Sequence, residues 1–310
     1  MMAIDPQLLA WYSRLAGEFG TIARPDEKGR RERYLAISTL LREPDPVGVT
    51  QRFLRLALPG RTIGADLYHP GGDRPPPLMI FAHGGGWVVG SAATHRDLGM
   101  RIAAQSGVAV LNVDYRLAPE HPFPAPCDDV YDALCWAAAQ ADELAIDARR
   151  IAVGGDSAGA HLAAGAAVTA RDRGGPELAF QWLMYPTIEP VFDNRSNREF
   201  GAGPGLTTDD MRYFWQQFLP GGLELDDPRA VPSRAESLSD LAPALVLVAG
   251  HDPLRDEGER HATRLDEAGV RVQLVRAADM THGFARLGVV CDEARRELDL
   301  ALVALRDAMA

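Results

Sequence analysis

This sequence of 310 residues contains little lysine, fewer basic than acidic residues and no long apolar run. Lys28 is the only lysine, and the 32 basic residues are outnumbered by 43 acidic ones, which gives a formal net charge of −11. Nucleic acids and anionic membranes are bound by net basic surfaces, so this balance argues against both as partners. We attribute the excess of arginine over lysine to genome composition and infer no function from it.

Cysteine is scarce as well. Cys127, Cys135 and Cys291 are too few and too widely spaced for a disulfide framework or a zinc site. No apolar run approaches the ~20 residues that a membrane-spanning helix needs, and the first residues lack the basic-then-apolar order of a secretory signal. We therefore expect a reduced, cytoplasmic protein without stable membrane association and without a metal site.

The rest of the composition is that of a folded globular protein, with 46% hydrophobic and 24% charged residues. The length fits two domains or one large α/β domain with an insertion. No internal repeat with a period of roughly 20 to 50 residues is found, which excludes repeat architectures.

Short apolar runs alternate with helical stretches along most of the chain, as in a parallel sheet that is buried on both faces. The runs are Leu78–Ala82, Val108–Val113, Ile151–Val153, Phe180–Met184, Leu245–Ala249 and Val270–Val275. Residues 53–58 and 63–68 flank Pro59-Gly60 and predict an antiparallel pair of strands. Helices are expected at 125–141, 158–171 and 291–308. The pattern predicts an α/β fold.

The segment 155–159, Gly-Asp-Ser-Ala-Gly, joins a predicted strand to a predicted helix. In so tight a turn the central residue takes a strained backbone angle, and glycines on both sides prevent collisions. The hydroxyl of Ser157 would then stand above the strand ends at the start of a helix, where it can attack a carbonyl. We predict that Ser157 is a nucleophile. Asp156 could hydrogen-bond around this turn or around the glycine-rich loop described next, or only be tolerated here, and we assign it no catalytic role.

A second glycine-rich segment, His83-Gly84-Gly85-Gly86-Trp87, follows the predicted strand 78–82. Such glycines let backbone N–H groups turn toward a substrate, as an oxyanion hole requires. A phosphate-binding loop is the alternative, but the lysine of a P-loop is absent and the spacing of a dinucleotide site does not fit. We expect the donors to be the N–H groups of Gly85, Gly86 and Ala158, with His83 and Gly84 supporting the loop.

A serine nucleophile needs a general base and an acid that follow it in the chain order Ser, acid, His. Of the eight histidines, His282 lies in the turn between the last predicted strand and the C-terminal helix, so it is the predicted base. Asp252 follows the predicted strand 245–249 and is the predicted acid. Its rivals are Asp256, expected early in a helix, and Asp279, expected in a loop. His161 is expected one turn into the helix behind the nucleophile, and the other histidines apart from His83 are expected to be surface or packing residues.

These motifs together closely resemble the hormone-sensitive lipase-like branch of the α/β-hydrolases, the bacterial family IV carboxylesterases. The resemblance spans essentially the whole chain, and it rests on the two glycine motifs above and on three further segments. These are Asp114-Tyr115-Arg116-Leu117-Ala118-Pro119-Glu120, Asp252-Pro253-Leu254-Arg255-Asp256-Glu257-Gly258 and His282-Gly283-Phe284. One departure is Ala160, where the family usually has glycine; its methyl group is expected to tighten packing or crowd the turn.

The resemblance implies an eight-stranded, mostly parallel sheet with helices on both faces, and a helical cap over the active site. It implies the same triad and oxyanion donors, no cofactor, and hydrolysis of small-molecule carboxylic esters with short to medium acyl chains. An amidase or formamidase of the same fold is the alternative, because a triad alone does not choose between ester and amide. A non-catalytic small-molecule receptor is disfavoured because receptors related to this family lose the base. A homodimer is left open.

Roughly sixty residues lie between Met184 and Leu245, far more than one helix with two short connections requires. We therefore expect the cap to consist of residues 1–45 and 187–220, and the catalytic core to consist of residues 46–186 and 221–310. The aromatic residues of 187–220 are expected mainly to pack the cap on the core. Phe200, beside two glycines, is the expected mobile lining residue of the site.

Overall fold

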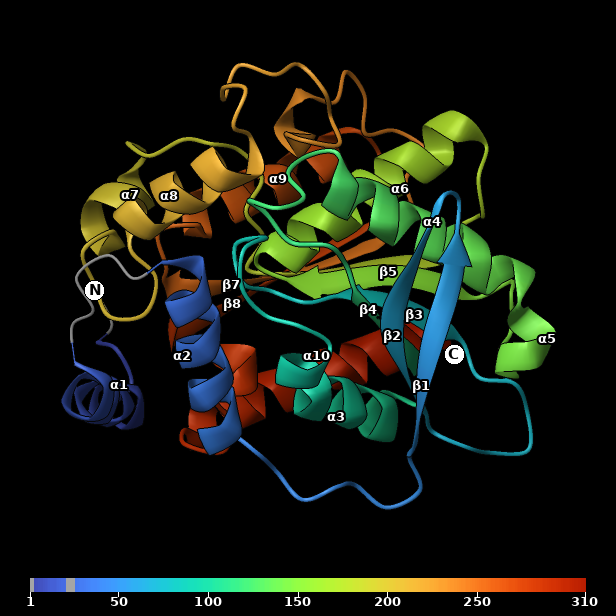
Figure 1. Ribbon diagram of the computed structural model, residues 1–310, viewed down its shortest axis with the longest axis horizontal. Helices are drawn as coiled ribbons and strands as arrows, with labels where there is room; N and C mark the ends of the chain where they lie inside the picture. The colour runs from blue at the N-terminus through green and yellow to red at the C-terminus, as the bar shows by residue number, and fades with distance from the viewer. Residues whose placement is uncertain (1–2, 21–25) are drawn as a thin grey trace.

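Eight strands form one mixed sheet in the computed structural model, which describes residues 3–20 and 26–310 (Figure 1). In spatial order the strands are β1 (Thr50–Leu58), β2 (Arg61–His69), β4 (Ala109–Asp114), β3 (Leu78–Ala82), β5 (Ile151–Asp156), β6 (Phe180–Met184), β7 (Ala244–His251) and β8 (Val272–Thr281). Only β2 runs antiparallel to its neighbours, β1 and β4. The expectation of an eight-stranded, mostly parallel sheet is therefore confirmed.

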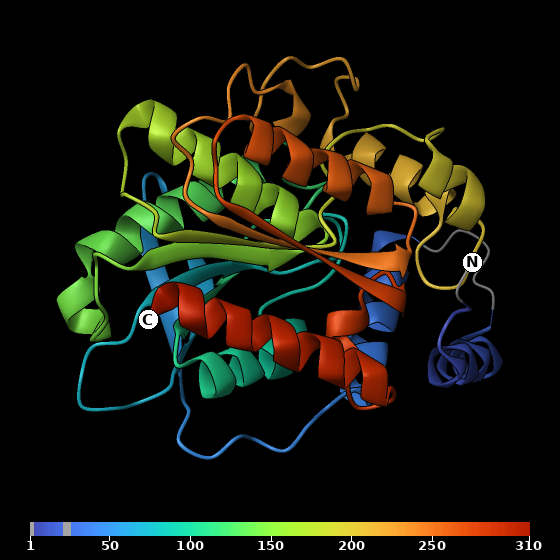
Figure 2. The ribbon, with the colours of Figure 1, turned by 180° about the vertical axis from the view of Figure 1, so that it is seen from behind.

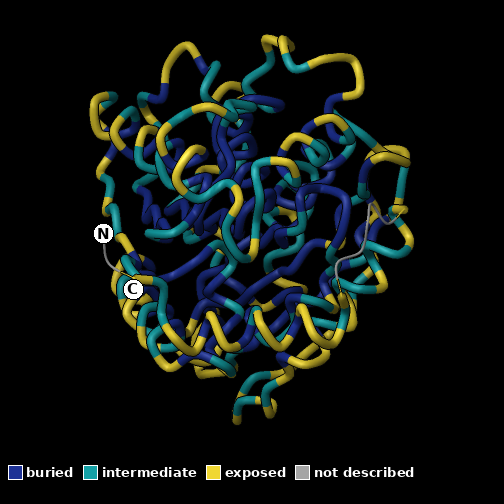
Figure 3. The backbone as a smooth tube through the Cα atoms, turned by 90° about the vertical axis from the view of Figure 1, so that its left-hand side faces the viewer, coloured by how far each residue is buried: buried dark blue, intermediate teal, exposed yellow. Residues whose placement is uncertain are grey.

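Helices cover both faces of this sheet (Figures 1 and 2). One face carries α4 (Ala125–Ala139), α6 (Ala158–Arg173) and α9 (Arg255–Glu267), and the other carries α3 (Arg96–Ser106) and α10 (Asp292–Met309). The short helix α5 (Ala141–Leu144) follows α4. Figure 3 shows that the buried backbone lies in the interior and that the exposed segments lie on the outside, both in loops and along the outer sides of helices.

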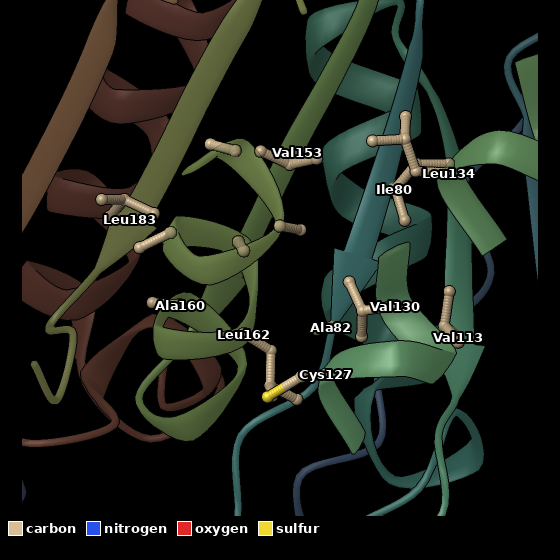
Figure 4. Packing of buried hydrophobic residues seen from close by; sticks show 14 of the residues in the cluster. Ile80, Ala82, Val113, Cys127, Val130, Leu134, Val153, Ala160, Leu162 and Leu183 are labelled. Carbon is tan, nitrogen blue, oxygen red and sulfur yellow. The ribbon is translucent and has the colours of Figure 1, made fainter. Parts of the chain in front are cut away.

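The helix after the predicted nucleophile lies close to the sheet because its side chains are small. All residues from Ala158 to Ala170 are buried, and most are alanine or glycine. Figure 4 shows Ala160 and Leu162 of this helix in the same cluster as Val153 and Leu183 of the strands. Ala160 is fully buried. The methyl group of Ala160, at a position where the family usually has glycine, is thus part of the packed core.

The last strand differs from its sequence prediction. The apolar run predicted Val270–Val275, but β8 extends to Thr281 and is an edge strand that pairs only with β7. An edge strand can carry charged residues such as Arg276 on its outer side, so the apolar run ends before the strand does. Asp279, expected in a loop, lies inside β8, and His282 follows the strand directly.

Four helices lie together beyond one end of the sheet (Figure 1). They are α1 (Pro6–Phe19), α2 (Glu27–Leu40), α7 (Arg195–Phe200) and α8 (Thr208–Phe218). The carboxyl ends of β5 and β7 face them (Figure 1). The inserted segment thus holds helices as expected, whereas the division into cap and core stays a prediction. None of the helices in the described part of the chain is both long and apolar enough to cross a membrane.

Three single turns of 3₁₀ helix complete the described elements. They are η1 (Ala93–His95) before α3, η2 (Pro232–Arg234) before β7, and η3 (Phe284–Arg286) after β8. In the chain, η1 follows β3 and η3 follows β8, so both come after the carboxyl end of a parallel strand. Their side chains can therefore reach the site described next.

Candidate active site

Ser157 stands at a sharp turn between β5 and α6. Its backbone has φ 57° and ψ −121°, a conformation that L-residues rarely adopt and that stores strain at functional sites. A Cβ atom on Gly155 would lie 2.4 Å from the carbonyl oxygen of Ala82, and one on Gly159 would lie 1.9 Å from the same oxygen. The two flanking glycines are therefore required by the close approach of β3, as the sequence pattern predicted.

Ser157, His282 and Asp252 form one chain of hydrogen bonds, although 125 residues separate the first two in sequence. The Oγ of Ser157 lies 2.9 Å from Nε2 of His282, and Nδ1 of His282 lies 2.7 Å from Oδ2 of Asp252. Asp252 is fully buried, and its other oxygen, Oδ1, accepts from the N–H of Leu254 at 2.8 Å. The structure thus brings together the three residues that the sequence singled out.

The two rival acids lie elsewhere. Asp256 is in the first turn of α9 and accepts through Oδ2 from the N–H of Ser196 at 2.9 Å. Asp279 lies within β8, three residues before His282. Neither is hydrogen-bonded to the imidazole of His282, whose Nδ1 is bonded to Asp252.

The glycine loop lines the same cavity as Ser157. Gly85 has φ +126° and Gly86 has φ +57°, backbone angles that favour glycine. A Cβ on Gly86 would lie 2.3 Å from the ring of Phe214 in α8, so this glycine also permits a close helix approach. Within the described residues, the N–H groups of Gly85, Gly86 and Ala158 donate no hydrogen bond to the protein backbone. Unpaired donors beside a nucleophile can bind a developing oxyanion.

His83 is buried behind this loop. Its Nδ1 donates to the carbonyl of Gly84 at 2.9 Å, its ring stacks on Tyr115 at 4.2 Å, and Tyr115 Oη donates to its carbonyl at 2.7 Å. Burial lowers the pKa of His83 to about 3, so the imidazole is neutral at ordinary pH. The histidine therefore holds the loop as a neutral donor.

Asp156 and His95 form a buried pair beneath the loop that sequence reasoning missed. Oδ1 of Asp156 accepts from the N–H of Gly84 at 2.7 Å and lies 3.3 Å from Nε2 of His95. Burial raises the pKa of Asp156, but His95 and then Arg286 offset this effect, so that the pKa is lowered overall. His95, expected to be a surface or packing residue, is thus a partner of the loop-holding carboxylate. No local signal marks it, since 61 residues separate the pair.

A cavity of about 580 Å³ opens above Ser157. Its lining includes Gly85, Gly86, Ala158 and His282 from the core. Most of the remaining wall is apolar and comes from α1, α2 and the segment around α8, including Trp11, Leu15, Ile37, Leu206, Met211 and Phe214. A cavity of this size, with few polar groups, suits a small organic substrate.

Phe200 does not line this cavity, contrary to the sequence expectation. Its ring lies 5.3 Å from that of His251, and the guanidinium of Arg255 lies over it at 5.0 Å. These contacts hold the end of α7 against the start of α9, away from Ser157. Phe214 of α8 takes the lining position instead.

The other aromatic side chains of α8 pack the helix onto the glycine loop, as expected for most of this group. Trp87 stacks on Phe218 at 4.4 Å and lies 4.7 Å from Trp215. Its Nε1 donates to Nδ1 of His161 at 3.3 Å. Among the residues that the structure describes, no group of three or more His, Cys, Asp or Glu side chains could hold a metal ion.

Comparison with known proteins agrees with this geometry. A family model described as the alpha/beta hydrolase fold matches residues 79–286. A carboxylic ester hydrolase of Mycobacterium tuberculosis, LipN, is 42% identical over 292 residues, which cover 92% of this chain and 77% of the relative. An ethyl acetate hydrolase of Pseudomonas putida is 35% identical over 320 residues, which cover 98% of this chain and 99% of the relative.

Solved structures give the same result. A hyperthermophilic esterase from the archaeon Pyrobaculum calidifontis superposes with a TM-score of 0.92 at 37% identity, covering 100% of both chains. A thermostable esterase from Pseudomonas putida superposes with a TM-score of 0.94 at 30% identity, covering 100% of this chain and 99% of the other.

Proposed function

The chain belongs to the hormone-sensitive lipase-like branch of the α/β-hydrolases and is a carboxylic ester hydrolase, and on this basis we propose that it cleaves short- to medium-chain esters through an acyl intermediate on Ser157. The observation that carries the mechanism is the hydrogen-bonded chain from Ser157 through His282 to Asp252 at the cavity wall.

In the first half of the reaction, Nε2 of His282 accepts the proton of Ser157 while Oγ attacks the ester carbonyl. The imidazolium then donates this proton to the oxygen of the leaving alcohol. Asp252 accepts from Nδ1 throughout, so it fixes the tautomer and stabilises the imidazolium without taking up the proton. In the second half, His282 activates a water that releases the acid from Ser157.

The negative charge that develops on the carbonyl oxygen needs donors that are already in place. We assign these to the N–H groups of Gly85, Gly86 and Ala158, which have no backbone acceptor within the described part of the chain. His83 and Gly84 support this loop, the first through its bond to the Gly84 carbonyl and the second through its bond to Asp156. Fixed donors of this kind contribute several kcal/mol to transition-state stabilisation.

The substrate range follows from the cavity. Its volume of about 580 Å³ and its apolar wall fit acyl chains of short to medium length. One relative is named an ethyl acetate hydrolase, which supports the short end of this range. Residues 1–45 and 187–220 are proposed as the cap, since both supply wall residues of the cavity. A cytoplasmic location stays part of the proposal.

The decisive experiment replaces Ser157 with Ala and measures turnover of p-nitrophenyl esters together with covalent labelling by a fluorophosphonate. Both should be lost, because one Oγ performs both reactions. Ser239→Ala, which removes a half-buried hydroxyl from a turn that does not line the cavity above Ser157, is the matched control and should change neither. If the Ser157→Ala protein is still labelled, Ser157 is not the nucleophile.

Amide hydrolysis is the remaining alternative, because the same triad can serve it. Turnover of p-nitrophenyl butyrate should exceed that of the matching aryl amide and of formamides by several orders of magnitude. Faster turnover of the amide or the formamide would make the protein an amidase.

A further inference from the structure

A second cavity, also of about 580 Å³, adjoins the cavity above Ser157. We call this second space the outer chamber. It shares a wall with the first cavity, including Arg33, Tyr34 and Phe214, and it is lined in addition by Arg30 and Asp210. A substrate bound at Ser157 therefore has a second compartment in reach, and that compartment adds the guanidinium of Arg30 to the lining.

More guanidinium groups than carboxylates line the cavity above Ser157 and the outer chamber, which together we call the double cavity. Arg30 lines the outer chamber, Arg286 lines the inner one and Arg33 lines both, whereas the acidic lining residues are Asp156 and Asp210. Both carboxylates are already engaged, Asp156 by Gly84 and His95, and Asp210 by the N–H and hydroxyl of Thr207. In a chain of net charge −11, the lining of this double cavity thus holds three arginines against two carboxylates.

Arg33 is available for an anionic ligand. Its Nη1 donates to the carbonyls of Phe19 and Gly20, each at 3.1 Å, and so caps the end of α1. Its Nε and Nη2 make no hydrogen bond within the described ranges, and neither is among the buried unpaired atoms. No carboxylate of the described chain lies within ion-pair distance of it. Arg33 therefore uses one guanidinium nitrogen to cap the end of α1, and its two other nitrogens can bind a ligand.

Arg30 adds an unmet donor of its own. Its guanidinium lies 4.1 Å above the ring of Tyr213, and its Nη1 is 4.0 Å from Oδ1 of Asp210, at the outer limit of an ion pair. Its Nε is buried and has no hydrogen-bond partner in the part of the chain that the structure describes. A buried donor of a charged group is costly to leave unpaired, so this position favours an acceptor from outside the protein.

We propose that the outer chamber binds a carboxylate of the substrate, so that the preferred esters carry a free acid group remote from the scissile bond. Monoesters of dicarboxylic acids and acyl esters of hydroxy acids belong to this class. The planar guanidinium of Arg33 can bind such a carboxylate by donating two parallel hydrogen bonds to it. Arg30 adds positive charge beside this pair. This inference rests on the proposed function, because it concerns the substrate of that same site.

The test compares pairs of esters that differ only in one terminal group, a carboxylate or the uncharged carboxamide of the same shape. Chains of roughly four to twelve carbons place this group at increasing distances from the scissile carbonyl. We expect the carboxylate ester to exceed its carboxamide partner in kcat/KM by about tenfold at the best length. Placing the carboxylate on the acid side or on the alcohol side shows which half of the substrate enters the outer chamber.

Variants assign this preference to the arginines. Arg33→Gln should lower the carboxylate-to-carboxamide ratio by about tenfold, mainly through KM, and Arg33→Lys should restore part of it because Lys keeps the charge without the planar fork. Arg30→Gln should lower the same ratio and leaves the bonds of Arg33 to the end of α1 in place. Arg14→Gln removes an exposed charge from α1 that lines neither cavity, so the ratio should not change.

The outcomes separate this inference from the function on which it rests. A wild-type ratio of one or below at every chain length overturns the inference while leaving ester hydrolysis intact. A ratio that neither Arg33→Gln nor Arg30→Gln alters overturns the assignment to the outer chamber. Absence of hydrolysis for both members of every pair, and for p-nitrophenyl butyrate, would instead remove the proposed function itself.

Discussion

The hydroxyl oxygens of Tyr12 and Thr281 lie 2.8 Å apart. Tyr12 belongs to α1, and Thr281 is the last residue of β8, directly before His282. Burial raises the pKa of Tyr12 to about 12, so its hydroxyl is protonated and can donate at neutral pH. The N–H of Asp5 also donates to the carbonyl of Asp279 at 3.0 Å. The N-terminal helix is thus hydrogen-bonded to the strand that positions the proposed base.

Tyr12→Phe should lower kcat by about threefold and leave KM nearly unchanged. The phenyl ring still fills its place in the cavity wall, but the fully buried hydroxyl of Thr281 loses its partner. We expect the free energy of unfolding to fall by about 1 kcal/mol. Steady-state kinetics and urea unfolding measure the two effects.

Tyr131→Phe is the control, since it removes a tyrosine hydroxyl from α4 on the opposite side of the structure from α1 (Figure 1). It should leave kcat unchanged. A Tyr12→Phe enzyme with unaltered kcat would show that the contact serves only to hold the helix in place.

Gly86→Ala should lower kcat/KM by at least about a hundredfold, the usual effect of losing one oxyanion donor. A methyl group at this position would lie 2.3 Å from the ring of Phe214, so either the loop or α8 must move. The second change Phe214→Ala removes the obstructing ring and should restore part of the activity.

Gly60→Ala is the matched control for backbone strain. Gly60 has φ +71° in the turn between β1 and β2, and a Cβ there meets no atom within 4 Å. This variant should lose about 1 kcal/mol of stability and keep its kcat/KM. Full activity of Gly86→Ala would show that the methyl group displaces α8 and leaves the loop in place, or that the N–H of Gly86 is not an oxyanion donor.

The parts of the structure that could be predicted from sequence are those whose physical causes are local. The turn at Ser157 needs small residues on both sides within one short segment, so Gly155 and Gly159 reveal it directly. Parallel strands such as β3 and β6 are buried on both faces, so their apolar runs coincide with the strands. Edge strand β8 is half exposed, and its prediction therefore ended six residues too early.

Relations between distant segments that carry no motif of their own could not be predicted from sequence. The elements α3, β4, α4 and α5 lie between His95 and Asp156 in the chain, and neither residue has a local pattern that indicates the other. The choice between Phe200 and Phe214 as a wall residue depends on which way α7 and α8 face. Both helices are aromatic and lie in the same inserted segment, so composition alone does not distinguish them.

Asp156→Asn should lower kcat/KM by about tenfold. The amide oxygen can still accept from the N–H of Gly84, but the negative charge beside His95 and Arg286 is lost. Asp156→Ala removes the acceptor as well, so we expect a further tenfold loss and a decrease of about 3 kcal/mol in the free energy of unfolding. Kinetics and urea unfolding of both variants measure these effects.

Asp73→Asn removes an exposed carboxylate from the connector before β3 and should have neither effect. If Asp156→Ala retained wild-type kcat/KM, the glycine loop would be held without this carboxylate, and His83 would be its main support.

Stability should fall in mild acid because several histidines are buried in the neutral form. Burial lowers the pKa of His83 to about 3 and the pKa values of His161 and His261 to about 4. In the unfolded chain a histidine titrates near pH ~6.5. Between these values the unfolded state binds more protons, so stability is fully present above about pH 6.5 and decreases as the pH falls toward 4. Each of these histidines should cost roughly 2 kcal/mol at about pH 5.

His261→Gln tests this prediction through a slope, so a general loss of stability does not disturb it. His261 lies in α9, and its Nδ1 has no hydrogen-bond partner in the described structure. Urea unfolding between about pH 7 and pH 5 should show one proton fewer taken up on unfolding, a slope smaller by about 1.4 kcal/mol per pH unit at its steepest. Burial also raises the pKa of Glu257, which opposes the trend, but this effect is common to both proteins. Thr263→Ala, an exposed change in the same helix, should leave the slope unaltered. An unaltered slope in His261→Gln would mean that the pKa of this histidine is the same in the folded and unfolded states.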